Sequence, residues 1–117
     1  MTEERDTLIR EIGRACELGD VSATHRLLHP AVVALVDSGG DLIAETEPVV
    51  GVIDVAQQLL ELCRGASVTV GEVNGVLALI VRRALRVTGV VAFDTAAEHV
   101  TRVWITLNPL KLRRWNS

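Results

Sequence analysis

The sequence of 117 residues has no tyrosine, one phenylalanine and two tryptophans, so aromatic side chains make up only 3 % of it. Hydrophobic residues nevertheless account for 49 %, and a chain of this length can bury a core without covalent cross-links. The core must therefore be built from valine, leucine, isoleucine and alanine.

The sequence also has no excess of basic over acidic residues, since its formal net charge is −3. This balance disfavours direct binding to nucleic acid, because neutralising phosphates requires a basic surface. No apolar run is long enough to span a bilayer. The charged N-terminus, MTEERDTLIREIG, also lacks the apolar stretch of a secretion signal. We therefore expect a cytoplasmic protein that contacts neither nucleic acid nor membrane.

Cysteine is scarce, and the two that are present, Cys16 and Cys63, fall within helical patterns. We expect both to be buried thiols that pack as small hydrophobic groups, because disulfides are uncommon in a reducing compartment. No spacing of cysteine and histidine resembles a metal site. The sequence thus predicts no metal and no other cofactor.

The spacing of hydrophobic residues, and the glycine, proline and capping residues between them, divide the chain into helices followed by strands. A helix ends at Gly19, and a shorter one, capped by Asp20, ends at Pro30. A third helix is expected over 52–64 and strands over 31–37, 67–73, 76–83, 86–94 and 99–107. The Asn74-Gly75 pair predicts a hairpin between the second and third of these strands. The order indicates an α+β fold with the helices gathered on one face of the sheet.

Four segments carry a resemblance to a known family: ELGDVSATHRLLHPAVVALVDSGGDLIAETEPVVG, VNGVLALIVR, VTGVVAFD and LNPLKLRR. With the element order, they resemble the SnoaL-like branch of the nuclear transport factor 2-like (NTF2-like) superfamily. Within that branch the chain is most similar to the C-terminal extension of a class of bacterial extracytoplasmic-function sigma factors. The resemblance implies one domain over 1–117, a cone in which helices pack on a curved, mostly antiparallel sheet.

Two motifs of that class are present, each with one residue changed. Its aspartate followed by three glycines reads Asp37-Ser38-Gly39-Gly40, and its Asn-Pro-Asp-Lys-Leu reads Asn108-Pro109-Leu110-Lys111-Leu112. The resemblance implies a regulatory motif that acts on the sigma factor by contact, made of Asp37, Gly39, Gly40, Asn108, Pro109, Lys111 and Leu112. The sigma regions that bind polymerase and promoter are absent from the sequence. The resemblance therefore implies a freestanding regulatory or ligand-binding domain.

The tail, residues 108–117, has the signals of a short helix. Asn108 is a good helix cap and Pro109 suits the first helical position. Leu112 and Trp115, three residues apart, would share one face of that helix. Two interpretations stay open: the apolar residues fold back over the sheet edge or the mouth of the cone, or they dock on a partner protein.

Related folds also host ketosteroid isomerases, epoxide hydrolases and polyketide cyclases, which need polar groups converging in an apolar cavity. Alignment by hand places the isomerase base at or near Leu35 and its protonated carboxyl near Gly89. Neither residue can move a proton, so we assign no catalytic residue. The three histidines, His25, His29 and His99, are interpreted as surface, turn or half-buried residues.

Alternation along the strands assigns the faces of the sheet. The expected apolar ligand pocket is lined by Leu35, Leu59, Leu79, Val91, Phe93, Val103 and Ile105. On the outer face, Arg102, Trp104 and Thr106 are expected to form a homodimer interface, because an isologous contact there would bury the tryptophan.

Three functions are compatible with these features. The first is a non-enzymatic domain that binds an apolar small molecule, or regulates a protein partner through its C-terminal tail. The second is a SnoaL-like isomerase, cyclase or epoxide hydrolase acting on a hydrophobic metabolite, which rests on the fold alone. The third is a dimeric scaffold whose cavity is filled by its own side chains.

Overall fold

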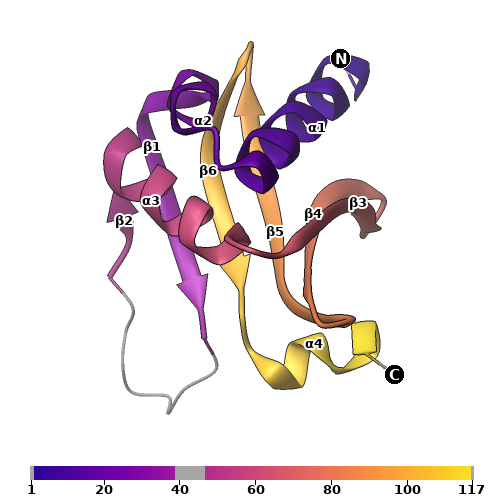
Figure 1. The fold of residues 1–117 in the computed structure, drawn as a ribbon. Helices are drawn as coiled ribbons and strands as arrows, with labels where there is room; N and C mark the ends of the chain where they lie inside the picture. The colour runs from indigo at the N-terminus through magenta and orange to yellow at the C-terminus, as the bar shows by residue number, and fades with distance from the viewer. Residues whose placement is uncertain (1, 39–46, 117) are drawn as a thin grey trace.

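The structure, a computed structural model, describes residues 2–38 and 47–116. Three of its helices lie together on one side of a curved sheet, and a fourth lies at the end of the sheet remote from the N-terminus (Figure 1). The helices are α1 (Thr2–Leu18), α2 (Val21–Leu27), α3 (Val52–Cys63) and α4 (Pro109–Asn116). The strands are β1 (Leu28–Asp37), β2 (Val49–Val50), β3 (Ser67–Val73), β4 (Val76–Arg83), β5 (Arg86–Ala96) and β6 (His99–Thr106).

The predicted signals at Gly19 and Asp20 are confirmed, but α2 ends at Leu27 and not at Pro30. Gly19 follows α1 with a φ of 71°, which a glycine adopts without steric cost. Asp20 caps α2, because its Oδ1 accepts a hydrogen bond of 3.0 Å from the Ala23 amide. The Thr24 hydroxyl donates to the Asp20 carbonyl at 2.8 Å, which satisfies a polar group that is fully buried.

The sheet has the strand order β2-β1-β6-β5-β4-β3. Every pairing is antiparallel except that of β1 with β6, which is parallel. The α+β class and the mostly antiparallel sheet are therefore confirmed. The expected hairpin turns at Asn74 and Gly75, whose φ angles of 52° and 79° are those that an Asn-Gly turn supplies.

Strand β1 differs from its prediction at its start. It begins at Leu28 rather than at residue 31, so Pro30 lies inside it. The register with β6 shifts between Leu28 and Val33. Proline has no amide hydrogen to donate to a ladder, and this irregular stretch is where a strand tolerates it.

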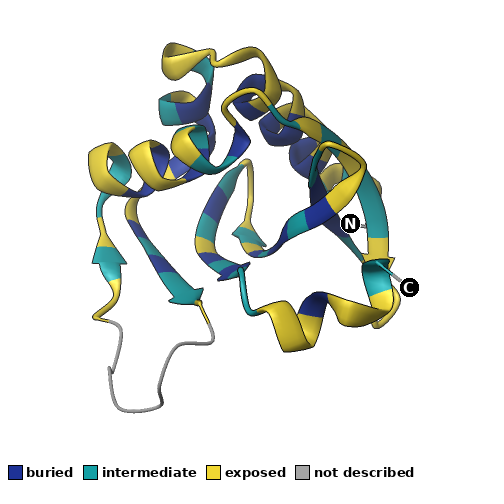
Figure 2. Cartoon of the chain, turned by 60° about the horizontal axis from the view of Figure 1, so that its bottom comes forward, coloured by how far each residue is buried: buried dark blue, intermediate teal, exposed yellow. Residues whose placement is uncertain are grey.

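The main core lies between the inner face of the sheet and helices α1, α2 and α3. It is aliphatic, as the composition predicted, and its only aromatic residue is Phe93. Dark blue segments on these helices and on the central strands mark this layer in Figure 2. Within the described part of the chain, no helix combines the length and apolar character needed to cross a membrane.

Both cysteines belong to this core and are free thiols, as expected. Cys16 lies in α1 and Cys63 in α3. A hydrogen bond to Cys63, together with burial, raises the pKa of the Cys16 thiol above its ordinary value. The same hydrogen bond lowers the pKa of the Cys63 thiol. The two thiols therefore form a buried contact between α1 and α3.

Candidate functional site at the junction of Asp37 and the C-terminal helix

The parallel pairing of β1 with β6 brings the two sequence motifs together. Parallel strands end at the same edge of a sheet, and the last register pair joins Asp37 to Thr106. The ladder continues for one more bond, since the Leu107 amide donates to the Asp37 carbonyl at 2.7 Å. Residues that follow β6 must therefore begin beside the end of β1.

Asn108 then turns the chain into α4. Its side-chain oxygen accepts a hydrogen bond of 3.0 Å from the Leu110 amide, and its carbonyl accepts one of 3.0 Å from the Leu112 amide. Pro109 occupies the first helical position, where the missing amide hydrogen costs nothing. The predicted helix cap is confirmed.

Lys111 ties the first turn of α4 back to the end of β1. Its Nζ lies 2.6 Å from Oδ2 of Asp37, while the side-chain Nδ2 of Asn108 donates to Oδ1 of the same carboxylate at 3.5 Å. The side chains of Lys111 and Asp37 are 64 % and 39 % exposed, so solvent screens the ion pair. The contact sets the direction of α4 more than it stabilises the fold. We call this arrangement of Asp37, Asn108 and Lys111 the junction.

Helix α4 packs on the outer face of the sheet. Leu112 is buried there with Trp115 beside it, in a second apolar cluster with Ala78, Ile80, Val87 and Val90. Gly71 lets Ile80 of this cluster pack closely against β3, because a Cβ at that position would lie 3.1 Å from Cγ1 of Ile80. The tail thus folds back as one interpretation expected, but it covers the outer face and not the mouth of the cone.

The far end of α4 is fastened as well. The Val87 amide donates to Oδ1 of Asn116 at 2.7 Å, and Nδ2 of Asn116 donates to the Val87 carbonyl at 3.0 Å. This paired contact uses backbone groups at the start of β5. Helix α4 is consequently held at both ends and by its buried side chain in the middle.

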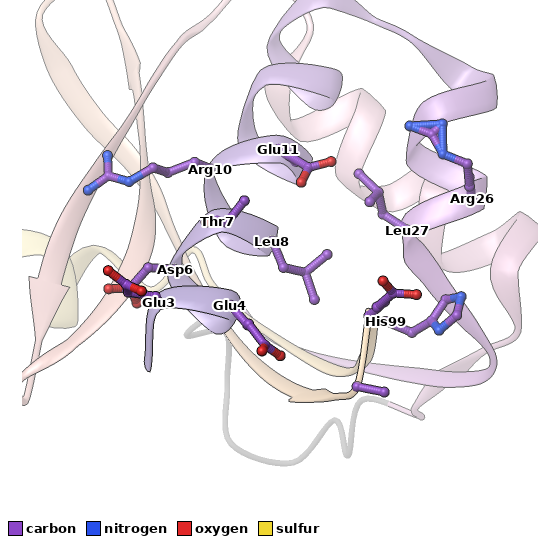
Figure 3. A pocket seen from close by; sticks show the side chains of 12 residues that line it. Glu3, Glu4, Asp6, Thr7, Leu8, Arg10, Glu11, Arg26, Leu27 and His99 are labelled. Carbon is purple, nitrogen blue, oxygen red and sulfur yellow. The ribbon is translucent and has the colours of Figure 1, made fainter. Parts of the chain in front are cut away.

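A wide hollow lies far from the junction, between the start of α1, the end of α2 and the β5–β6 turn. Its volume is about 1000 Å³. In Figure 3, Leu8 and Leu27 point toward its middle, while Glu4, Glu11 and His99 stand around it. Sequence reasoning missed this grouping, although the spacing of Glu4, Leu8 and Glu11 on one helical face was a usable signal.

The acidic groups of this hollow remain largely solvated. Glu3, Glu4, Glu11 and Glu98 are exposed, and only Asp6 and His99 are half-buried. No group of three or more histidine, cysteine, aspartate or glutamate side chains in residues 2–38 and 47–116 is arranged to hold a metal ion. The hollow is open and polar, unlike the apolar cavity of an isomerase.

Comparison with known proteins gives matches in structure only. No protein-family model matches the sequence, and no curated protein matches it either. Among solved structures, the extracytoplasmic function sigma factor SigJ of Mycobacterium tuberculosis superposes with a TM-score of 0.69 at 21 % identity. That match covers 91 % of this chain but only 42 % of SigJ.

Two further solved structures match nearly along their whole length. An NTF2-like protein of unknown function from Burkholderia xenovorans has a TM-score of 0.61 at 12 % identity, covering 88 % of this chain and 81 % of that one. The chain has the NTF2-like fold. An LEH-like epoxide hydrolase of M. tuberculosis has the same TM-score at 11 % identity, covering 97 % of this chain and 89 % of the hydrolase.

The NTF2-like cone is filled where a ligand pocket was expected. Six of the seven expected pocket residues are buried in the main core: Leu59, Leu79, Val91, Phe93, Val103 and Ile105. They line none of the four hollows of about 1000, 660, 490 and 370 Å³ on the molecule. Their inward orientation agrees with the prediction, but they contact one another.

The expected position of Leu35 was wrong. This residue pairs with Trp104, so it lies on the outer face, while its neighbour Ala34 is buried, as are Leu28 and Val32. In the run AVVALV both sets of alternating positions are apolar. The pattern therefore does not show which set faces the core. The small Ala34 faces the helices, which lets α3 approach the strand.

The residues expected at a dimer interface do lie on the outer face. Arg102 is exposed and Thr106 is half-exposed. The Arg102 guanidinium lies 5.7 Å from the centre of the Trp104 ring. Leu35 and Ala92 are register partners of Trp104 on either side. Helix α4 covers the other part of this face, over β3, β4 and β5.

The expected regulatory residues serve as structural parts of the junction. Asp37, Asn108 and Lys111 form it, Pro109 is the first residue of α4, and Leu112 is the buried anchor of that helix. Gly39 and Gly40 lie outside the described residues. The two motifs that resemble those of the sigma factors are therefore parts of one site, which their separation in sequence does not suggest.

Proposed function

We propose that this chain is a non-enzymatic regulatory domain that acts by contact with a protein partner at the junction and at α4. The single observation that supports the proposal is the ion pair of Lys111 with Asp37, which unites the two motifs of the sigma-factor class. The partner is an extracytoplasmic-function sigma factor.

The exposed side chain of Leu110 allows a direct test. A photoreactive amino acid at Leu110, which is 73 % exposed, would be crosslinked in the source cells and the adduct identified by mass spectrometry. The matched control carries the same group at Ile53 on α3, which is 72 % exposed. We expect a sigma-factor adduct from Leu110 and none from Ile53. Equal adducts from both positions, or none, would contradict a contact function.

Binding of an apolar small molecule is the other function of such a non-enzymatic domain, and the packing of the core supports it less well. A ligand inside the cone would have to displace side chains that are fully buried, such as Leu59 and Val103. Native mass spectrometry of protein purified from cells decides this point. We expect the mass of the polypeptide without a bound molecule.

An enzyme acting on a hydrophobic metabolite is the second candidate, favoured by the carboxylates around the wide hollow. Asp6 and His99 are its half-buried titratable groups and would be the acid–base pair. Turnover of a panel of apolar epoxides and 3-ketosteroids tests it. Activity that Asp6→Asn and His99→Gln both abolish would replace the regulatory proposal.

We also propose a homodimer formed through the uncovered outer face, with Trp104 at its centre. Tryptophan is enriched among the residues that dominate interface energies. Asp94 of β5 and Arg102 of β6 are register partners, so both charges lie at one border of this face. An isologous contact would bring each charge near its opposite on the second copy.

A further inference from the structure

The groove between α4 and the start of β5 has an apolar floor and basic edges. Its volume is about 490 Å³, and Val87, Leu107 and Leu112 form the apolar part of its lining. Arg86 and Arg113 line it from opposite elements, one from β5 and one from α4. We call it the α4 groove.

Neither arginine of the α4 groove is already occupied within the described structure. Both are exposed, and neither guanidinium is hydrogen-bonded to or paired with a residue in 2–38 or 47–116. No carboxylate lines the groove. Desolvating these charges would be favourable only with an anionic partner.

The basic residues of the chain are concentrated in its C-terminal third, which includes the α4 groove. Residues 82–117 carry seven of the twelve basic residues but only two of the fifteen acidic ones, a balance of +5 in a chain of net charge −3. The five acidic side chains around the hollow at the other end include Glu3, Glu4 and Glu98. Helix α4 itself contains Lys111, Arg113 and Arg114 and no acidic residue, so the groove is bordered by a basic helix.

Exposed leucines adjoin the groove on both elements. Leu85, next to Arg86, is 97 % exposed, and Leu110, next to Pro109, is 73 % exposed. Leu85 and Ala84 turn the β4–β5 hairpin with φ angles of 69° and 49°, which residues other than glycine and asparagine adopt at a steric cost. The β3–β4 hairpin makes the same kind of turn with Asn74 and Gly75, so the alanine and leucine are not demanded by the turn.

We propose that the α4 groove binds an acidic, leucine-rich amphipathic segment of the partner protein. The inference rests on the proposed function and names the chemistry of the partner. Leucines of such a segment would cover Leu107 and Pro109, which lie over the buried Val87 and Leu112. Its carboxylates would pair with Arg86 and Arg113. The exposed Leu85 and Leu110 would extend the apolar contact at its borders.

A peptide fits this surface better than nucleic acid or a membrane. Nucleic acid binding draws on many phosphate contacts, whereas this groove offers two guanidinium groups over an aliphatic floor without an aromatic stacking platform. A membrane would meet the protruding Leu85 and leave the concave floor uncovered. The groove is also preformed, because Asn116 fastens α4 to Val87, so little ordering is needed on binding.

The test is fluorescence anisotropy with a labelled synthetic peptide of leucines at helical spacing and glutamates elsewhere. Wild-type protein should bind it saturably and more weakly as salt rises. The double variant Arg86→Glu and Arg113→Glu should weaken binding by about tenfold or more. The matched control, Arg10→Glu and Arg26→Glu at the acidic hollow, has the same net charge and should change it by less than about twofold.

Further measurements separate the other outcomes. Circular dichroism establishes that the variants fold, and the single variant Arg113→Gln should show an intermediate loss of affinity. The proposal is overturned if the wild type does not bind, if both double variants weaken binding equally, or if a lysine version of the peptide binds as well. Tighter binding to anionic vesicles or single-stranded DNA than to the peptide would also overturn it.

The two proposals fail separately. A sigma-factor adduct from Leu110 without peptide binding would leave the regulatory contact intact and remove only the α4 groove as its place. Peptide binding without a sigma-factor adduct would keep the groove and contradict the choice of partner.

Discussion

The inner face of the sheet is closed by three helices, whereas the outer face is closed by one short helix over part of its area. On the inner face, large aliphatic side chains such as Ile9, Leu59 and Leu79 have no solvent exposure. On the outer face, Leu112 is the only buried side chain that α4 contributes. The difference indicates that the inner face carries the stability of the fold and that the outer face is where contacts can vary.

The largest effect is expected on the inner face. Replacing Phe93, the only aromatic residue of the main core, should lower the free energy of unfolding by about 3–5 kcal/mol, because Phe93→Ala leaves a cavity among rigidly packed neighbours. Urea unfolding measures the loss. Leu85→Ala, at a 97 % exposed position, is the control and should change stability by less than about 0.5 kcal/mol.

Removal of α4 tests whether the outer face is dispensable for folding. A chain ending at Asn108 should keep its far-UV circular dichroism and lose about 2–3 kcal/mol, the contribution expected from one buried leucine and its partly buried neighbour. The uncovered Ile80 and Val90 should bind a hydrophobic dye. Loss of cooperative unfolding would mean that α4 belongs to the core, and the distinction between the two faces would fail.

The uncovered part of the outer face should respond to Trp104→Ala by dissociation. We expect the dimer dissociation constant to rise by about tenfold or more, because the residue lies at the centre of the proposed interface. Sedimentation velocity over a range of concentrations measures it, with Ile53→Ala on α3 as the control. A dimer unaffected by Trp104→Ala would remove this interface.

The smallest effect is expected at the junction. Lys111→Met should cost no more than about 1 kcal/mol, because the ion pair with Asp37 is exposed and screened. The loss should shrink at high salt. Lys111→Arg preserves the charge and should retain wild-type stability. A cost of several kcal/mol would show that the junction is part of the stabilising core.

The helices and the antiparallel strands were predictable because their signals are local. The α3 prediction ends one residue beyond the observed Cys63, and both β3 and β4 have the expected bounds. The apolar spacing of the helices, the Asp20 cap and the Asn74-Gly75 turn each depend only on residues a few positions apart in the sequence. The orientation of Arg102 and Trp104 was likewise predictable, because polar and apolar residues alternate in β6.

The face of β1 and the location of α4 were not predictable in this way. Residues 31–36 of β1 are apolar in both phases, so the choice between Val32 and Val33 as the buried residue depends on what packs against the strand. The apolar side chains of α4 fit any apolar surface within reach. Their position on β4 and β5 follows from where β6 ends.

By itself the sequence determined an aliphatic core, the order and bounds of most elements, and a capped helix at the C-terminus, since each depends on composition or on neighbours along the chain. Only the tertiary structure decided that β1 and β6 run parallel, and with that pairing it placed Asp37 beside Lys111, 74 residues away. Long-range strand pairing depends on the packing of whole faces, to which no short stretch of residues is a sufficient guide.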